Sequence, residues 1–134
     1  MLHVWLHIDP RSSVPMYQQV VEGVKEAVAR GVLNPGDKLP SVRELAMELT
    51  INHNTVAKAY QELEREHVIE VIRGRGTFIA TEPDIPDLSV RVRELKEEMV
   101  RWIVEAHHLH LSDEELVELF QTVLREWREG RETL

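Results

Sequence analysis

The fold is decided by the stretch Ser41-Val-Arg-Glu-Leu-Ala-Met-Glu-Leu-Thr50-Ile-Asn-His-Asn-Thr-Val-Ala-Lys-Ala-Tyr60, which predicts two short helices joined by a tight turn. Ser41 and Glu44 have the spacing of a capping box, which begins the first helix. Asn52 is a typical N-cap for the second helix. Each helix has one apolar face, formed by Val42, Leu45, Ala46 and Leu49 in the first and by Val56, Ala59, Tyr60 and Leu63 in the second. The stretch is therefore a helix-turn-helix pattern.

The sequence on either side of this pattern predicts one more helix and a β-hairpin. Pro15 suits the first turn of a helix, apolar residues at helical spacing follow it, and Gly31 offers a stop. After the helix-turn-helix, two β-prone runs, Val68–Ile72 and Thr77–Ala80, flank the glycine-rich Arg73-Gly-Arg-Gly76. Such runs around glycines predict a hairpin, which makes the pattern a winged helix-turn-helix.

A break rich in proline and acid divides the chain. Two prolines and three acids occur within residues 81–87, which is typical of a linker. We therefore expect a winged helix-turn-helix domain over residues 1–80, a linker over 81–86 and a helical module over 87–134. Leu2–Ile8 is a candidate for a further short strand. The expected fold class is mainly α with a small β-hairpin, followed by an antiparallel helical pair.

The helical module carries a heptad seam, in which apolar residues step by four and three from Leu88 to Leu109. Ser112 and Glu115 form a second capping box, and a last helix follows it. The few residues between the two helices predict an antiparallel pair. Two helices bury two apolar stripes poorly alone, so we expect a homodimer. The predicted interface residues are Leu88, Val92, Leu95, Met99, Trp102, Ala106, Phe120 and Trp127.

Polar and basic residues of the first domain predict contacts with DNA. A helix that enters the major groove by its N-terminal end needs polar side chains that reach base edges. On a hairpin tip, arginine suits a phosphate or a narrow minor groove. The residues predicted to bind DNA are Arg43, Asn52, His53, Asn54, Thr55, Lys58, Arg73, Gly74, Arg75 and Gly76. The alternative is an ordinary N-cap, solvated hairpin arginines and a surface Arg43 paired with Glu44 or a neighbour.

Composition narrows the classes of function. The 134 residues carry a net charge of −8, and the acid is concentrated after residue 80. DNA binding needs a local basic surface, so this sum does not exclude it. The chain has no cysteine, which excludes disulfides and zinc–thiolate sites. With neither a long apolar run nor a signal sequence, we expect a cytoplasmic protein without a membrane partner.

No arrangement typical of an enzyme stands out in the sequence. His107, His108 and His110 cluster at a predicted helix end, where histidine interacts favourably with the helix dipole. Their spacing does not match a common metal-ligand pattern. We therefore expect no catalytic residue, no metal and no cofactor.

Three motifs occur in order at the spacing of a known family. They are Pro35-Gly-Asp-Lys-Leu-Pro-Ser-Val-Arg-Glu-Leu-Ala46, Asn54-Thr-Val-Ala-Lys-Ala-Tyr-Gln-Glu-Leu-Glu64 and Gly74-Arg-Gly-Thr-Phe78. The chain closely resembles the GntR family of winged-helix regulators over residues 9–80. The second motif and the short tail resemble its YtrA-type subfamily.

The resemblance implies a DNA interface, and the sequence departs from the family's pattern at three positions. It implies contacts from Arg43, from the stretch 52–55 and from the wing tip 74–76. The family usually has arginine where Ala57 stands, so that base contact is not carried over. The family often has glycine where Thr50 and His67 stand, so we expect side chains in a strained backbone there.

These observations predict a sequence-specific DNA-binding regulator, and specifically a repressor that acts as a homodimer on a two-fold symmetric operator. The resemblance implies control of a transport operon, by analogy only. An unidentified small-molecule effector stays open, although the tail is short for an ordinary ligand cavity. A helical protein-interaction module on a winged-helix scaffold also stays open. A positive surface around Asn54, Lys58 and Arg75 favours DNA, and an apolar or acidic one favours a protein partner.

Overall fold

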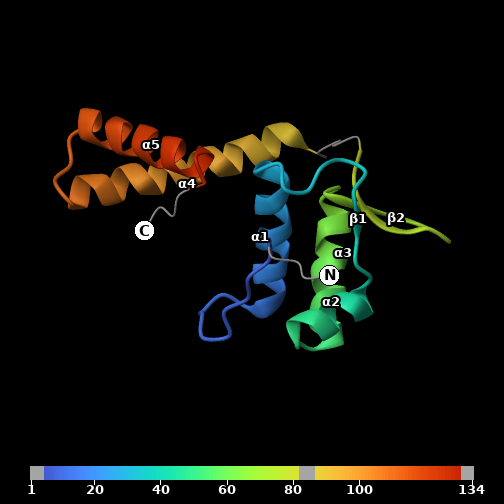
Figure 1. Ribbon diagram of the computed structural model, residues 1–134. Coiled ribbons are helices and arrows are strands. Elements are labelled where there is room, and N and C mark those ends of the chain that lie inside the picture. Colours follow the sequence, from blue (N-terminus) through green and yellow to red (C-terminus); the bar gives the residue numbers. More distant parts are fainter. Residues whose placement is uncertain (1–4, 82–86, 131–134) are drawn as a thin grey trace. The chain divides into compact units, whose positions relative to one another are not determined.

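The structure is a computed structural model that describes residues 5–81 and 87–130. The chain forms two compact units, Met1–Pro86 and Asp87–Leu134, each described here by itself (Figure 1). The first unit contains α1 (Met16–Ala29), β1 (Lys38–Leu39), α2 (Val42–Leu49), α3 (His53–Arg65), β2 (Ile69–Ile72) and β3 (Gly76–Ile79). The second unit contains α4 (Leu88–His108) and α5 (Asp113–Arg128). The expectation of a mainly helical fold with a small hairpin is confirmed.

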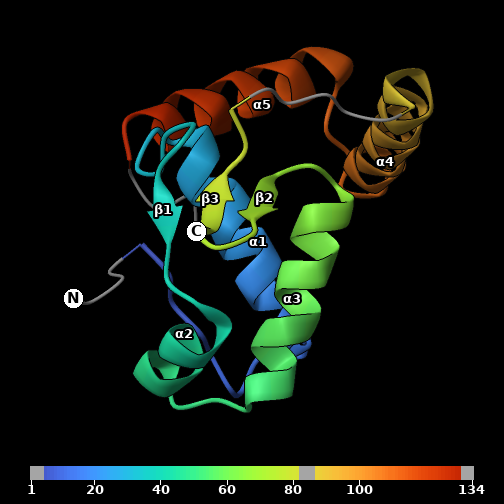
Figure 2. The ribbon, with the colours of Figure 1, turned by 90° about the vertical axis from the view of Figure 1, so that its right-hand side faces the viewer.

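One apolar core holds the first unit together. α1 packs along α3, α2 lies near the start of α3, and the strands cover the remaining side (Figure 2). The largest fully buried side chains are Leu45, Leu63, Ile69, Ile79, Val20, Val24 and Val56. Each such side chain contributes about 1.5–3 kcal/mol when buried, so this core is the main source of stability for the unit.

The sheet has one more strand than the predicted hairpin. Its strands lie in the order β1-β3-β2 and are all antiparallel. Thr77 of the central strand faces Leu39 on one side and Val71 on the other. β1 is only two residues long, which is too short to show an alternating pattern in the sequence.

The helix-turn-helix begins and ends as its capping residues predict. Ser41 Oγ accepts a hydrogen bond from the Glu44 backbone N at 3.1 Å, and Glu44 Oε1 accepts one from the Ser41 N at 2.8 Å. α2 ends at Thr50, whose φ of 55° is left-handed. His67, just after α3, is also left-handed, with φ of 62°. Both positions therefore have the backbone that glycine would adopt at lower cost.

The short strand predicted over Leu2–Ile8 is not formed at residues 5–8. Residues 1–4 lie outside the described part of the chain, and residues 5–8 have no strand. Instead, Leu6 is buried against α1 at Gly23. A Cβ at Gly23 would lie 2.2 Å from Leu6 Cδ1, so glycine lets the end of this side chain approach α1 closely. The segment is held by side-chain packing and not by a backbone ladder.

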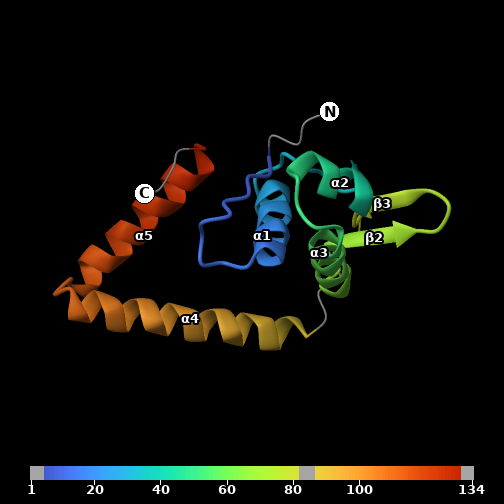
Figure 3. The ribbon, with the colours of Figure 1, turned by 90° about the horizontal axis from the view of Figure 1, so that it is seen from below.

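The second unit is an open helical hairpin. α4 and α5 are joined by a short turn and diverge from it (Figure 3). The turn contains His110 with φ of 62°, and the Ser112–Glu115 capping box begins α5. The rings of Trp102 and Phe120 lie with their centroids 6.0 Å apart. This aromatic contact bridges the two helices.

Most apolar side chains of this hairpin are exposed in the single chain. Among the predicted interface residues, the exposed fractions of Leu88, Val92, Leu95, Met99, Trp102 and Phe120 lie between 36% and 57%. Trp127 is half-buried. Ala106 differs from the others, because it is only 5% exposed and its own chain already covers it. The hairpin therefore has little core of its own.

Candidate nucleic-acid interface

The first turn of α3 presents polar side chains to solvent. Asn52, His53 and Asn54 are exposed, and Thr55 is half-buried. Asn52 Oδ1 accepts a hydrogen bond from the Asn54 backbone N at 2.7 Å, so the Asn52 oxygen serves as the helix cap. The Asn54 side chain has no hydrogen-bond partner among the described residues. It is thus the amide that can bond adenine in two places.

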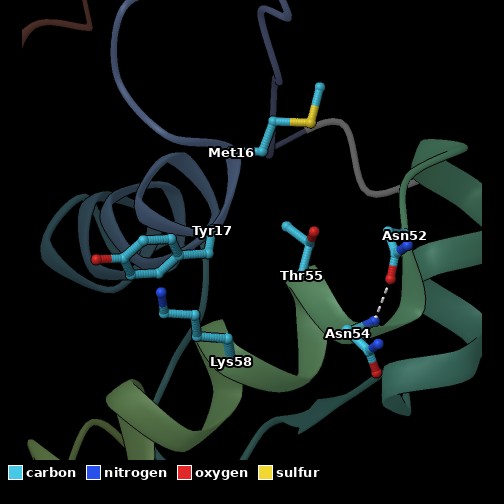
Figure 4. A pocket seen from close by; sticks show the side chains of 6 residues that line it. All are labelled: Met16, Tyr17, Asn52, Asn54, Thr55 and Lys58. Atoms are coloured by element: carbon cyan, nitrogen blue, oxygen red, sulfur yellow. Dashed lines mark hydrogen bonds between the residues drawn. The ribbon is translucent and has the colours of Figure 1, made fainter.

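A hollow of about 430 Å³ lies between the first turns of α1 and α3 (Figure 4). It is lined by Met16, Tyr17, Asn52, Asn54, Thr55 and Lys58. Lys58 Nζ lies 4.0 Å from the centroid of the Tyr17 ring, which is the geometry of a cation–π contact. Sequence reasoning selected the α3 residues but missed Met16 and Tyr17, because no spacing in the chain links them to α3.

The opposite side of α3 fixes the helix to the rest of the unit. Its buried residues are Val56, Ala59, Tyr60 and Leu63. Tyr60 Oη donates a hydrogen bond to the Pro40 carbonyl oxygen at 2.8 Å, just before α2. Burial raises the pKa of the Tyr60 phenol, and the charges of Glu44 and Glu48 raise it further. The hydroxyl therefore stays protonated and keeps donating at physiological pH.

Arg43 lies on the exposed side of α2. Within the described residues Arg43 forms no ion pair, so the alternative, a pairing with Glu44 or a neighbour, does not occur there. The Glu44 carboxylate instead accepts the hydrogen bond from the Ser41 backbone N. The Arg43 guanidinium, with its planar set of donors, is available to a base edge or a phosphate.

The wing is the turn between β2 and β3. Arg73, Gly74 and Arg75 are exposed, and the Arg75 backbone N donates to the Ile72 carbonyl oxygen at 2.9 Å. Gly76 has φ of 128°, and a Cβ there would lie 3.0 Å from Lys38 Cε. The positive φ favours glycine at this end of the turn, whereas a Cβ would meet only the flexible end of the Lys38 side chain. Both wing arginines project from a turn that lies outside the apolar core.

The structure brings together only part of the predicted DNA-binding set. Asn52, Asn54, Thr55 and Lys58 share the hollow, whereas Arg43 and the wing residues do not line it. Four of the ten predicted residues are basic and none is acidic, so this set favours an anionic partner such as DNA. Among the described residues no cluster of metal-binding side chains occurs. No helix in those ranges is long and apolar enough to span a bilayer.

A recognition helix with a polar start, held by a buried core and followed by a basic hairpin, defines the class of winged-helix DNA-binding proteins. Residues 16–79 match the family described as "Bacterial regulatory proteins, gntR family". The chain is also similar to the HTH-type transcriptional repressor YtrA of Bacillus subtilis (strain 168), with 42% identity over 94% of this chain and 97% of the relative. The chain therefore belongs to the GntR family, and it is a DNA-binding transcriptional regulator.

Solved structures agree with this assignment. A transcriptional antiterminator from Listeria monocytogenes EGD-e superposes with a TM-score of 0.80 and 36% identity, over 96% of each chain. YtrA from Sulfolobus acidocaldarius, a GntR-family transcription factor, gives a TM-score of 0.57 and 38% identity over 70% of this chain and 97% of that one. These relatives are transcription proteins and not enzymes, so the expectation of a non-enzymatic regulator is confirmed.

Proposed function

We propose that the protein is a repressor that binds a two-fold symmetric operator as a homodimer. The observation that carries the dimer is the exposed apolar seam of α4, together with the exposed apolar face of α5. Leu88, Val92 and Leu95 are each at least 43% exposed in the single chain. Soluble proteins rarely leave so continuous an apolar surface uncovered, and a heptad seam is the pattern by which helices associate.

In this proposal the two units have separate tasks. Residues 1–80 bind DNA, 81–86 connect the units and 87–134 form the dimer. Two recognition helices read half-sites on one face of DNA when they stand about 34 Å apart, or a multiple of it. The segment that joins the two units therefore governs operator spacing. A small-molecule effector or a partner that acts on the second unit can then change DNA affinity without touching the DNA surface.

The DNA contacts are divided between base reading and backbone binding. Arg43, Asn54 and Thr55 read base edges in the major groove, because they are exposed or half-exposed at the helix-turn-helix. Lys58 binds a phosphate next to them. The wing arginines bind the backbone or an adjacent minor groove, where arginine is favoured. A DNA partner also places the protein in the cytoplasm.

Selection of bound sites from random duplex DNA by the purified protein tests this function. We expect an inverted repeat whose half-site centres are spaced by one helical turn or a multiple of it. Sedimentation at the same protein concentration should show a dimer. Recovery of no enriched site would overturn sequence-specific binding, and a single half-site bound by a monomer would overturn the dimer. Reporter expression from the selected site, lowered by the protein, tests repression of a nearby transport operon or another target.

A further inference from the structure

We infer that Tyr17 is a positioning residue for DNA binding, because its aromatic face holds the Lys58 ammonium beside the hollow where a backbone phosphate binds. The inference rests on the proposed DNA contact of Lys58 and adds a residue of α1 to it. Tyr17 lies in the first unit but outside the helix-turn-helix. The ligand proposed for the positioned Lys58 ammonium is a backbone phosphate of a DNA duplex.

The geometry joins two elements that are distant in sequence. Lys58 Nζ lies 4.0 Å from the Tyr17 ring centroid, and both side chains line the same hollow (Figure 4). Figure 4 shows the ammonium beside the ring, with Thr55 on the same helix facing the space between α1 and α3. A free lysine has four rotatable side-chain bonds and samples many positions. The contact with the ring restricts that sampling before DNA arrives.

The charge of Lys58 is otherwise uncompensated within the described residues. No ion pair joins it to an acid there, whereas Arg65, the other basic residue of α3, pairs with Glu62. An aromatic face attracts a cation without neutralising it, so the ammonium keeps its full charge for a phosphate. A carboxylate in the place of Tyr17 would hold the lysine equally well but would repel DNA.

Tyr17 can position Lys58 because packing against the core fixes its side chain. The side chain is half-buried and packs against the apolar core of the first unit. The ring therefore has a fixed position relative to α3, to which α1 is packed. Ordering Lys58 in advance lowers the entropy lost on binding, which strengthens association without a new contact.

The experiment measures binding of a random-sequence duplex, so it needs no knowledge of the operator. Affinity is measured over a range of salt concentrations for the wild type, Tyr17→Leu, Tyr17→Phe, Lys58→Ala and the double variant Tyr17→Leu/Lys58→Ala. Lys58→Ala should lower the salt slope by about one, because one phosphate contact is lost. Tyr17→Leu should weaken binding roughly threefold and leave the slope unchanged, because Lys58 is present but no longer positioned.

Two comparisons separate positioning from a structural role. Tyr17→Phe keeps the ring and should bind as the wild type does, and the double variant should bind no more weakly than Lys58→Ala alone. Val28→Ala is the matched control, since Val28 is also a half-buried residue of α1 packed on the core. It should lower the unfolding temperature without changing DNA affinity.

The outcomes distinguish the inference from the proposed function. Additive losses in the double variant, or equal losses for Tyr17→Phe and Tyr17→Leu, would overturn the positioning role while DNA binding stands. Tighter binding by Tyr17→Leu would show that the ring withholds the lysine from DNA, which also overturns it. A wild-type protein that binds no duplex at low salt would overturn the DNA contact itself.

Discussion

The dimer can be tested most sharply by placing two carboxylates in the apolar seam of α4. The double variant Leu95→Glu/Met99→Glu replaces residues that are 50% and 36% exposed in the single chain. Full burial of a leucine or methionine contributes about 1.5–3 kcal/mol, so covering the exposed part of each recovers about 1 kcal/mol. Over both residues and both chains the sum is ~4 kcal/mol, or roughly a thousandfold in the dimer dissociation constant.

The carboxylates add to this loss, because an unpaired charge is strongly disfavoured in an apolar interface. Sedimentation across a range of micromolar concentrations should therefore show a monomer for the variant and a dimer for the wild type. The matched control is Arg93→Glu/Arg101→Glu, which adds two carboxylates on the side of α4 opposite the seam and should remain dimeric. A fully dimeric Leu95→Glu/Met99→Glu variant would refute the assignment of this seam.

Three more expectations concern the first unit. On a selected operator, Arg43→Ala should lower the binding free energy by roughly 1–3 kcal/mol and relax base preference. Lys58→Ala should lower the affinity for specific and random DNA alike. If both variants lost the same affinity for specific and for random DNA, Arg43 would not be a base-reading residue. The double variant Arg73→Ala/Arg75→Ala should lower operator affinity. It should leave the thermal unfolding midpoint unchanged, because neither side chain contributes to the core. An unchanged operator affinity in the folded variant would exclude the wing as a DNA contact. Leu6→Ala should destabilise the fold by about 2–5 kcal/mol in denaturant unfolding, since the Leu6 side chain is only 6% exposed, and an unaltered midpoint would show that the N-terminal segment is not packed on α1.

Much of the first unit could be predicted because its local signals agree with its packing. The Ser41–Glu44 pair predicts the start of α2, and the structure forms both of its hydrogen bonds. Thr50 and His67 have the left-handed backbone that the resemblance to the family implies. The first signal lies within a few residues, which is the range over which sequence patterns are informative, and the second comes from the family's pattern.

The sequence-based predictions that were wrong or missing concern contacts between residues that are distant in the sequence. The apolar run that ends at Ile8 was expected to be a strand, but Gly23 provides a site for its side chains on α1. β1 forms only because β3 lies beside it. The contact between Tyr17 and Lys58 joins helices separated by the whole of α2. No periodic pattern in the sequence indicates any of these three contacts.

The position of β3 in the middle of the sheet has a mechanical consequence. β3 pairs with β1 on one side and with β2 on the other, and it is the last strand before the chain passes to the second unit. A force along β3 therefore loads two ladders in shear at once, instead of peeling away an edge. β1 ends two residues before α2 and β2 ends at the wing, so the same load divides between the helix-turn-helix and the wing. A displacement of β3 thus shifts the segment before the helix-turn-helix and the wing together.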